Sequence, residues 1–301
     1  MDGSDLSATT TIPPLDLRRP AKQTVPMVVA SPHSGANYPA EFVAASRLDP
    51  LTLRRSEDAF VDEIFAAAPR LGAPMLAARF PRAYLDVNRE AWELDPAMFA
   101  DALPDWVNMR SPRVRMGLGT IARVVASGEE IYGGKLSFAE AQERVEQLYH
   151  PYHAALNELV EDTALAFGFC LVLDCHSMPS GAQGGAQGGT QGGAAREPVD
   201  IVLGDCHGAA CSPQIVECAR HYLARRGYAV ALNAPYAGGF TTGHYGRPRY
   251  GRHALQIEIN RALYMDERNY HRRPGFDRLR EEMAGLVAKL GAFAQDLAQI
   301  C

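Results

Sequence analysis

Residues 170–180 read CLVLDCHSMPS and join an apolar run to a group of polar side chains. The run begins with four apolar residues and is ended by Met178 and Pro179, which is typical of a short buried strand. In open α/β sheets, ligands bind in the crevice outside the carboxyl ends of the strands. His176 is therefore expected at a strand end, two residues after Asp174. Two interpretations of His176 stay open here: a metal-binding or catalytic histidine, or a core histidine bonded to its own loop.

The composition is that of a globular protein without an excess of charge. A chain of 301 residues fits one large or two small domains, and 47% hydrophobic residues supply an ordinary core. A net charge of −5 argues against a nucleic-acid partner. No apolar stretch approaches the roughly 20 residues of a membrane helix. The first residues lack the basic start and apolar middle of a secretory signal, so we expect a cytoplasmic protein that binds no membrane.

The chain divides into three expected parts. Residues 1–22 contain several prolines and predict a flexible arm, and residues 23–301 predict a single domain. Within this domain, residues 181–198 are almost entirely Gly, Gln and Ala and predict a mobile loop next to the His176 segment. The six cysteines contain no C-x-x-C pair, which argues against a zinc ribbon or a dithiol redox site.

A second histidine, like His176, follows a predicted strand. Val28 to Ala30 predict a short strand, His33 lies in the turn after it, and Gly35 permits a tight approach of the backbone. Residues 56–72 then predict a helix that begins at Ser56. Its first turns carry four acids, which we interpret mainly as complementing the helix dipole. One of them could point into a site at the start of the helix.

Residues 73–90 predict two short strands that end in Asp86-Val87-Asn88-Arg89. An arginine fork beside a neutral amide suits recognition of a carboxylate, although a surface salt bridge with Glu90 is the simpler alternative. Residues 91–116 predict a long covering loop, and Arg123 follows as a candidate for the pocket.

The clearest helix is expected over 138–167. Ser137 and Glu140 form a capping box, Pro151 predicts a kink, and Gly168 closes the helix. His150 and His153 share one face of this helix. We favour a role in packing or in a substrate wall for this pair, because the spacing alone is weak support for a metal.

The last third of the chain predicts alternating elements. Strands are expected at 200–204, 228–232 and 253–264, helices at 212–227 and 274–299, and a glycine-rich loop at 233–246. In the strand 253–264 the apolar residues lie on one face and Glu258 on the other. A charged residue in a buried strand destabilises the fold unless it has a partner or a function. Glu258 is therefore the leading candidate for a functional carboxylate in this chain.

Strands and helices thus alternate throughout, which predicts an α/β fold with a mixed, mostly parallel sheet. The strand ends present His33, His176, a carboxylate at 57–58, Glu258 and the Asn88-Arg89 pair. Two imidazoles and one carboxylate suit zinc with a position open for water, and a further carboxylate could act as general base and acid. The Asn-Arg pair would anchor an anionic substrate.

Several stretches together resemble the N-formylglutamate amidohydrolase family, over about residues 26–270. The matching stretches are SPHSGANYP, EDAFVDEIF, FPRAYLDVNRE, GLGTIARV, the LYHPYH helix, LVLDCHSMP, DIVLGD, GGFTTGHYG and LQIEINRALYMDE. This family is related in architecture to zinc carboxypeptidases and aspartoacylase-like enzymes. The resemblance implies a single-domain, three-layer α/β/α fold of the phosphorylase/hydrolase type, and a metal-dependent hydrolase of histidine breakdown that splits N-formyl-L-glutamate into formate and L-glutamate.

The resemblance also implies roles for individual residues. His33 and His176 match the histidine ligands of one divalent ion, with Zn²⁺ as the expected metal. The acidic ligand of related carboxypeptidases stands three residues after the first histidine, where this chain has Ala36. We therefore choose Asp58 as the acidic ligand, with Glu57 second.

Glu258 matches the general base in this resemblance. The expected substrate-binding residues are Asn88 and Arg89 for a carboxylate, Arg82 and Arg123 for the amide oxygen or a second carboxylate, and His244 for the pocket wall. The implied partner is a small anionic N-acyl amino acid. Three alternatives stay open: a deacylase for another N-acyl amino acid, a peptide-trimming carboxypeptidase, and a small-molecule binding protein that has lost catalysis.

Overall fold

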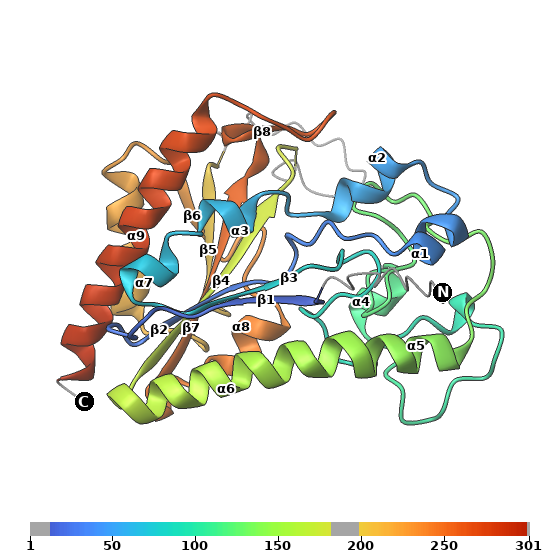
Figure 1. Ribbon diagram of the computed structural model, residues 1–301, viewed down its shortest axis with the longest axis horizontal. Helices are drawn as coiled ribbons and strands as arrows, with labels where there is room; N and C mark the ends of the chain where they lie inside the picture. Colours follow the sequence, from blue (N-terminus) through green and yellow to red (C-terminus); the bar gives the residue numbers. More distant parts are fainter. Residues whose placement is uncertain (1–12, 182–198, 300–301) are drawn as a thin grey trace, which may run out of the picture.

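The computed structural model describes residues 13–181 and 199–299 (Figure 1). Within these residues the strands are β1 Leu15–Arg18, β2 Met27–Ser31, β3 Met75–Ala78, β4 Cys170–Met178, β5 Ile201–Gly204, β6 Val230–Leu232, β7 Arg252–Asn260, β8 Met265–Asp266 and β9 His271–Arg272. The α-helices are α1 Ala40–Ala45, α2 Pro50–Leu53, α3 Val61–Ile64, α4 Pro112–Arg115, α5 Phe138–Arg144, α6 His150–Phe167, α7 Pro213–Ala224, α8 Phe240–Tyr245 and α9 Gly275–Ala298. Shorter helical turns are η1 Arg54–Ser56, η2 Ala68–Leu71, η3 Pro96–Met98, η4 Val145–Tyr149, η5 Pro248–Tyr250 and η6 Arg261–Leu263.

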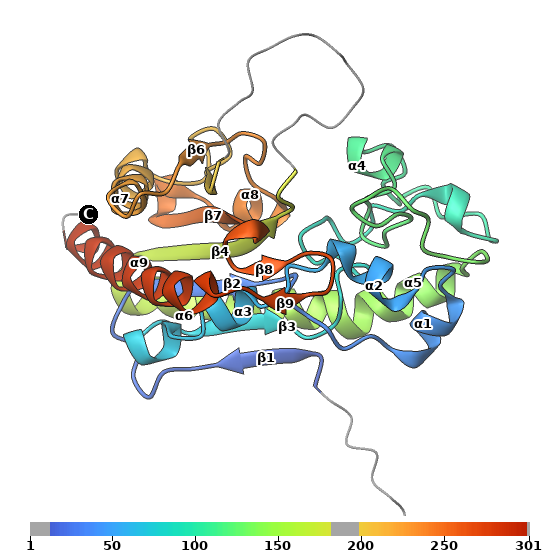
Figure 2. The ribbon, with the colours of Figure 1, turned by 90° about the horizontal axis from the view of Figure 1, so that it is seen from above.

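The main sheet is mixed and mostly parallel, as predicted. Its order is β1-β3-β2-β4-β7-β5-β6, from one edge to the other (Figure 2). The central strands β3, β2, β4 and β7 run parallel, whereas β1 is antiparallel to β3 and β5 is antiparallel to β7. β4 and β7 are paired over nine residues each, and this long pairing sets His176 opposite Glu258.

Each face of the main sheet packs against its own hydrophobic core. In β4, Leu171 and Leu173 face the core that α3, α7 and α9 cover, whereas Cys170 and Val172 face the core beneath α6. Side chains alternate along a strand, so Asp174 and His176 belong to the α6 side. Helices α7 and α9 lie along one side of the sheet and α6 along the other, which confirms the three-layer α/β/α prediction (Figure 1).

Three local predictions are wrong. The expected arm over 1–22 contains β1, which extends the sheet, while residues 1–12 lie outside the described part. The helix expected over 56–72 is broken into η1, α3 and η2, because Phe60 has a left-handed φ of 67° and Ser56 accepts a hydrogen bond from Ala126 N instead of capping a helix. The second strand expected before residue 90 is a series of turns.

The long helix expected over 138–167 is present as α5, η4 and α6. Ser137 and Glu140 form the capping box, and Gly168 ends the helix with a φ of 68°. The backbone adjusts to Pro151 by a π-helical turn at η4, directly before it. Among the described helices, none combines the length and apolarity that crossing a membrane requires. The expected mobile loop at 181–198 lies, except for Gly181, outside the described residues.

Candidate metal centre

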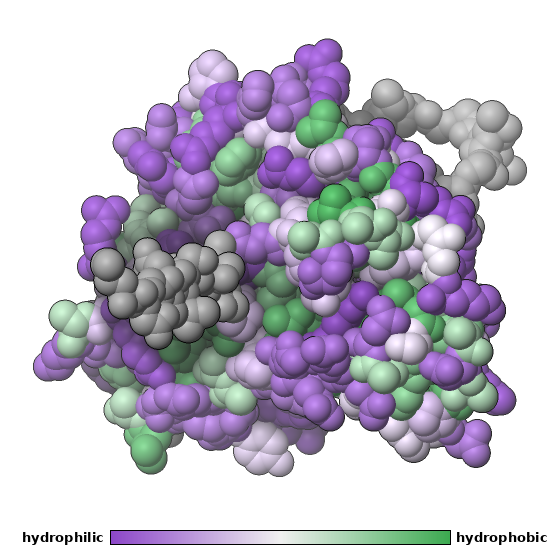
Figure 3. All heavy atoms as spheres, turned by 45° about the vertical axis from the view of Figure 1, so that its right-hand side comes forward, coloured by the Kyte–Doolittle hydropathy of each residue, from purple (hydrophilic) through white to green (hydrophobic). Residues whose placement is uncertain are grey.

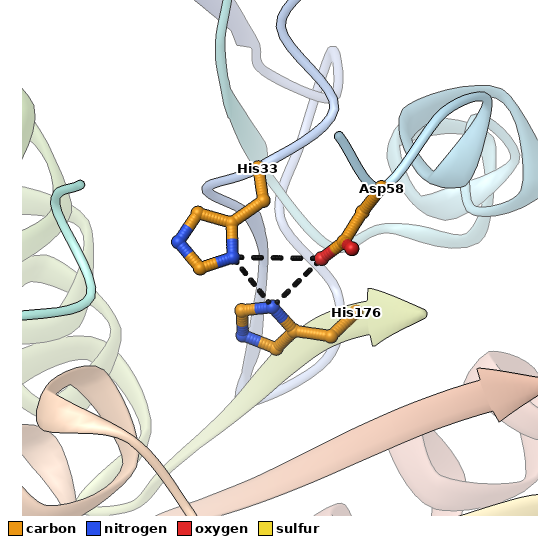
Figure 4. Close-up of side chains that lie close together, drawn as sticks. All are labelled: His33, Asp58 and His176. Carbon is orange, nitrogen blue, oxygen red and sulfur yellow. Dashed lines mark hydrogen bonds and ion pairs between the residues drawn. The ribbon is translucent and has the colours of Figure 1, made fainter. Parts of the chain in front are cut away.

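Two histidines and one aspartate converge at the carboxyl end of the central strands (Figure 4). The Nδ1 atoms of His33 and His176 are 3.1 Å apart. Asp58 Oδ2 lies 3.5 Å from His33 Nδ1 and 3.1 Å from His176 Nδ1. All three side chains are buried. The sequence placed the two histidines at separate strand ends, and the structure brings them together with Asp58.

The sheet explains this convergence. β2 and β4 are neighbours and run parallel, so the residues at their carboxyl ends meet at the same edge. Asp58 is attached to the same place, because its backbone N–H donates to His33 O at 2.9 Å. Gly35 allows the His33 turn to approach the chain, since a Cβ there would lie 2.2 Å from Phe80 O.

A carboxylate lies next to the Nε2 atom of each imidazole. His33 Nε2 lies 2.7 Å from Asp86 Oδ1, and His176 Nε2 lies 2.8 Å from Asp174 Oδ1. We infer from these partners that both Nε2 atoms carry protons, which leaves the Nδ1 lone pairs facing each other. Two lone pairs and a carboxylate oxygen this close together repel unless a cation lies among them. The donor set of two nitrogens and one oxygen fits a divalent metal ion.

The electrostatics favour a cation at this point. Burial alone would lower the pKa of His176, but Asp174, Asp58 and Glu258 hold it well above its usual range. Burial alone would raise the pKa of Asp58, but the two histidines and Arg261 hold it well below its usual range. Either a proton or a metal ion therefore satisfies this group, and a metal ion would displace the proton.

Asp58 is oriented so that one oxygen stays available. Its Oδ1 accepts from Arg261 Nη2 at 3.0 Å and from Ser177 Oγ at 3.3 Å, which leaves Oδ2 directed at the imidazoles. Glu57, the other candidate for an acidic ligand, accepts from Arg54 and Tyr38 instead. The structure thus brings Asp58, and not Glu57, to the two histidines.

Glu258 lies beside the cluster on β7. It is paired in register with His176 on β4, is 8% exposed, and its Oε1 accepts from Gln256 Nε2 at 3.1 Å. Burial raises the pKa of Glu258 to about 7, with His176 opposing and Asp58 adding to the rise. A carboxyl group with this pKa can both accept and release a proton near neutral pH.

Positive charge collects around Asp86, the partner of His33. Arg82 donates to Asp86 at 2.7 Å, and Arg89 Nη2 lies 3.6 Å from the same carboxylate. Asn88 presents its amide nitrogen 3.2 Å from His176 Nε2, and its oxygen accepts from Thr241 N at 2.8 Å. Burial lowers the pKa of Arg89 to about 10. Asn88 and both arginines thus adjoin the cluster.

Two expected substrate residues are placed elsewhere, and these expectations need correction. Arg123 forms ion pairs with Asp95 and Glu130, because the 117–132 segment turns its side chain toward its own loop. His244 is exposed and stacks on Phe240, because α8 directs Thr241 and Thr242, rather than His244, inward.

The histidine pair on α6 is not part of the cluster. His150 is exposed, whereas the ring nitrogens of His153 lie 2.9 Å from Tyr245 Oη and 2.8 Å from Val87 O. His153 thus supports the chain just before Asn88, in keeping with the packing role favoured from the sequence.

Sequence reasoning assigned no role to three residues that hold the cluster in place. Asp86 and Asp174 fix the histidine rings, and Arg261 fixes Asp58. Both aspartates lie two residues from a residue that the sequence had singled out, Asn88 and His176 respectively. That proximity was the available signal, whereas Arg261, which follows β7, carried none.

Comparison with known proteins agrees with this geometry. The model of the N-formylglutamate amidohydrolase family matches residues 25–265. The chain belongs to the N-formylglutamate amidohydrolase family. The resemblance stated from the sequence motifs is thereby confirmed.

Relatives of this family support the assignment. N-formylglutamate deformylases of Pseudomonas putida and Pseudomonas aeruginosa are 27% and 29% identical over 246 and 253 residues, 81% of this chain and 83% of each relative. The crystal structure of N-formylglutamate amidohydrolase from Ralstonia eutropha JMP134 has a TM-score of 0.87 at 38% identity, covering 95% of this chain and 99% of that one.

Proposed function

We propose that this chain hydrolyses the amide of N-formyl-L-glutamate to formate and L-glutamate, using one divalent metal ion, Zn²⁺, held by His33, Asp58 and His176. The observation that carries this proposal is the meeting of two imidazole nitrogens and a carboxylate oxygen, which lie 3.1 to 3.5 Å from one another in a buried position. The names of the family and of its relatives supply the substrate. A metal ion at this position would lower the pKa of a bound water to about 7 and polarise the acyl oxygen.

Glu258 is the proposed general base. Its carboxyl group neighbours His176 across the strand pair, and its pKa of about 7 leaves a large fraction ionised at neutral pH. It would take the proton of the attacking water and then deliver it to the departing nitrogen of glutamate. The same group serves both steps because its two protonation states are close in free energy.

The arginines beside Asp86 would hold the substrate. Asn88 and Arg89 are proposed to bind a carboxylate, since a guanidinium beside an amide offers several parallel donors. Arg82, which is held by Asp86, is proposed to stabilise the negative charge that develops on the acyl oxygen. The expected roles of Arg123 and His244 in substrate binding are not carried forward.

The test is metal analysis of the purified protein together with formate release from N-formyl-L-glutamate. We expect about one divalent ion per chain, loss of turnover after chelation, and recovery with Zn²⁺. A panel of N-formyl and N-acetyl derivatives of glutamate and aspartate then determines the acyl group. Turnover that persists at full rate in a protein shown to be free of metal would overturn the proposal.

A further inference from the structure

Arg113 differs from the other half-buried and buried arginines of the described residues because its guanidinium has no hydrogen-bond or ion-pair partner. It lies half-buried on α4, and its guanidinium forms no hydrogen bond or ion pair within residues 13–181 and 199–299. Every other half-buried or buried arginine in those ranges forms a hydrogen bond or an ion pair with an oxygen atom: Arg18, Arg54, Arg79, Arg82, Arg89, Arg123, Arg144, Arg252 and Arg261. A partly desolvated guanidinium without a hydrogen-bonded or directly ion-paired partner is costly, which points to an anionic ligand.

The chain sets Arg113 beside the proposed carboxylate site. Leu118 N donates to Arg113 O at 2.8 Å, and Leu118 O accepts from Arg89 Nε at 2.9 Å. Figure 3 turns the right-hand side of Figure 1, where α4 is labelled, toward the viewer, and the face it shows carries hydrophilic residues interspersed with hydrophobic patches. Burial, Arg82 and Arg113 all act to lower the pKa of Arg89, so the guanidiniums lie close enough to repel one another.

The charge of Arg113 also acts on Cys206, a residue near the support of His176. Burial, Asp205 and Asp174 raise the pKa of the Cys206 thiol, and Arg113 opposes this rise. Cys206 packs against Gly238, and Thr242, on the helix that follows, donates to Asp174 at 3.0 Å. The charges of Arg113 and of Asp174, the partner of His176, therefore both act on the Cys206 side chain.

We infer that Arg113 is the specificity-determining residue that binds the side-chain carboxylate of the substrate, while Asn88 and Arg89 bind its α-carboxylate. This inference rests on the proposed function, because an N-acyl glutamate carries two carboxylates and requires two cationic contacts. A charge-assisted, bidentate contact from Arg113 would discriminate the dianion from its neutral amide analogue. The substrate class is thus an N-acyl amino acid with a second carboxylate.

A purely structural role for Arg113 gives different expectations. Glu93 is buried, its Oε2 has no partner among the described residues, and burial raises its pKa while Arg113 opposes the rise. If Arg113 served only to stabilise Glu93, its loss would lower stability and would affect all substrates equally. The experiment therefore compares substrates as well as variants.

The test uses Arg113→Ala and Arg113→Lys, with Arg115→Ala as the matched control because Arg115 is exposed on the same helix and its loss changes the net charge equally. For N-formyl-L-glutamate we expect Arg113→Ala to lower kcat/KM by about 10- to 100-fold, mainly through KM, which corresponds to one lost charged contact. Arg113→Lys should recover part of this loss. N-formyl-L-glutamine should be hydrolysed equally by the wild type, Arg113→Ala and Arg115→Ala.

Calorimetric binding of glutarate and of its monoamide gives a readout that needs no turnover. We expect Arg113→Ala to weaken glutarate binding by about 10-fold or more and to leave monoamide binding unchanged. An equal loss for both kinetic substrates, or equal glutarate binding by the wild type and Arg113→Ala, would overturn the inference. If the wild type released no formate from either substrate, the proposed function would fail, and the glutarate comparison would still decide the role of Arg113.

Discussion

The buried histidines at the strand ends and the half-buried His153 on α6 differ in what lies at the second ring nitrogen. At the strand ends, His33 and His176 each have a carboxylate at Nε2. On α6, His153 has a backbone carbonyl and a tyrosine hydroxyl. The carboxylates make the first pair electron-rich and favour a positive charge nearby, whereas the neutral partners make His153 a neutral packing residue.

The pKa directions express the same difference. The carboxylates hold the pKa of His176 well above its usual range despite burial, whereas burial lowers that of His153 to about 4. His176 is buried and His153 half-buried, and burial acts to lower the pKa of both, so burial alone does not explain the opposite directions. The partner of the ring decides whether an imidazole can serve as part of a cation site, and the predictions for His176, Asp174 and His153 below test that distinction.

The largest effect is expected from His176→Ala, compared with His153→Gln. Loss of a ligand should reduce metal affinity by more than the 10- to 100-fold typical of an outer-shell partner, and turnover should disappear with the metal. His153→Gln should retain about the wild-type metal content. Metal analysis of both variants is the measurement, and unchanged metal content in His176→Ala would contradict the ligand role.

Glu258→Gln should separate proton transfer from metal binding. The neutral amide cannot accept the proton of the attacking water, so we expect kcat to fall by about 10²- to 10⁴-fold. The metal content should stay at the wild-type level, because Glu258 is not among the three converging residues. Formate release and metal analysis on the same preparation check this, and a near-normal rate would rule out Glu258 as the base.

Asp174→Asn should give the ring of His176 a neutral partner, as the ring of His153 has. The neutral amide keeps the shape but removes the charge behind the ring, and metal affinity should fall by about 10- to 100-fold. Competition with a chelator measures the affinity. Thr242→Val, which removes the hydroxyl that donates to the other oxygen of Asp174, should give a smaller loss in the same direction.

The smallest effect concerns the pH dependence of stability. The folded pKa of His153, about 4, lies below the roughly 6.5 expected in the unfolded chain, so the folded state favours the neutral ring. Its contribution is complete above pH 6.5 and is lost as the pH falls toward 4. Between pH 7 and 4.5 the wild type should lose about 2 kcal/mol more unfolding free energy than His153→Gln. Parallel urea-unfolding curves would contradict this.

The fold was largely predictable because its signals are local. Short apolar runs ended by Pro or Gly marked β2, β4 and β5, and the capping box at Ser137 marked the start of the long helix. The helix expected over 56–72 failed for a tertiary reason. The left-handed Phe60 interrupts the helical pattern, and the site holds Asp58 by contacts with distant residues that no local periodicity records.

The order of amino acids by itself indicated polar residue types at the strand ends, an acid nearby and a single charge in an otherwise apolar strand. These signals are local, because side-chain alternation and turn chemistry act over a few positions. Three features followed from packing alone: which acid meets the imidazoles, which carboxylate lies at the Nε2 atom of each ring, and that Arg123 pairs with Asp95 and Glu130. His33 and His176 are separated by 143 positions, and Asp58 and Arg261 by 203. Contacts over such distances arise from the pairing of whole strands, which is why the folded chain was needed to find them.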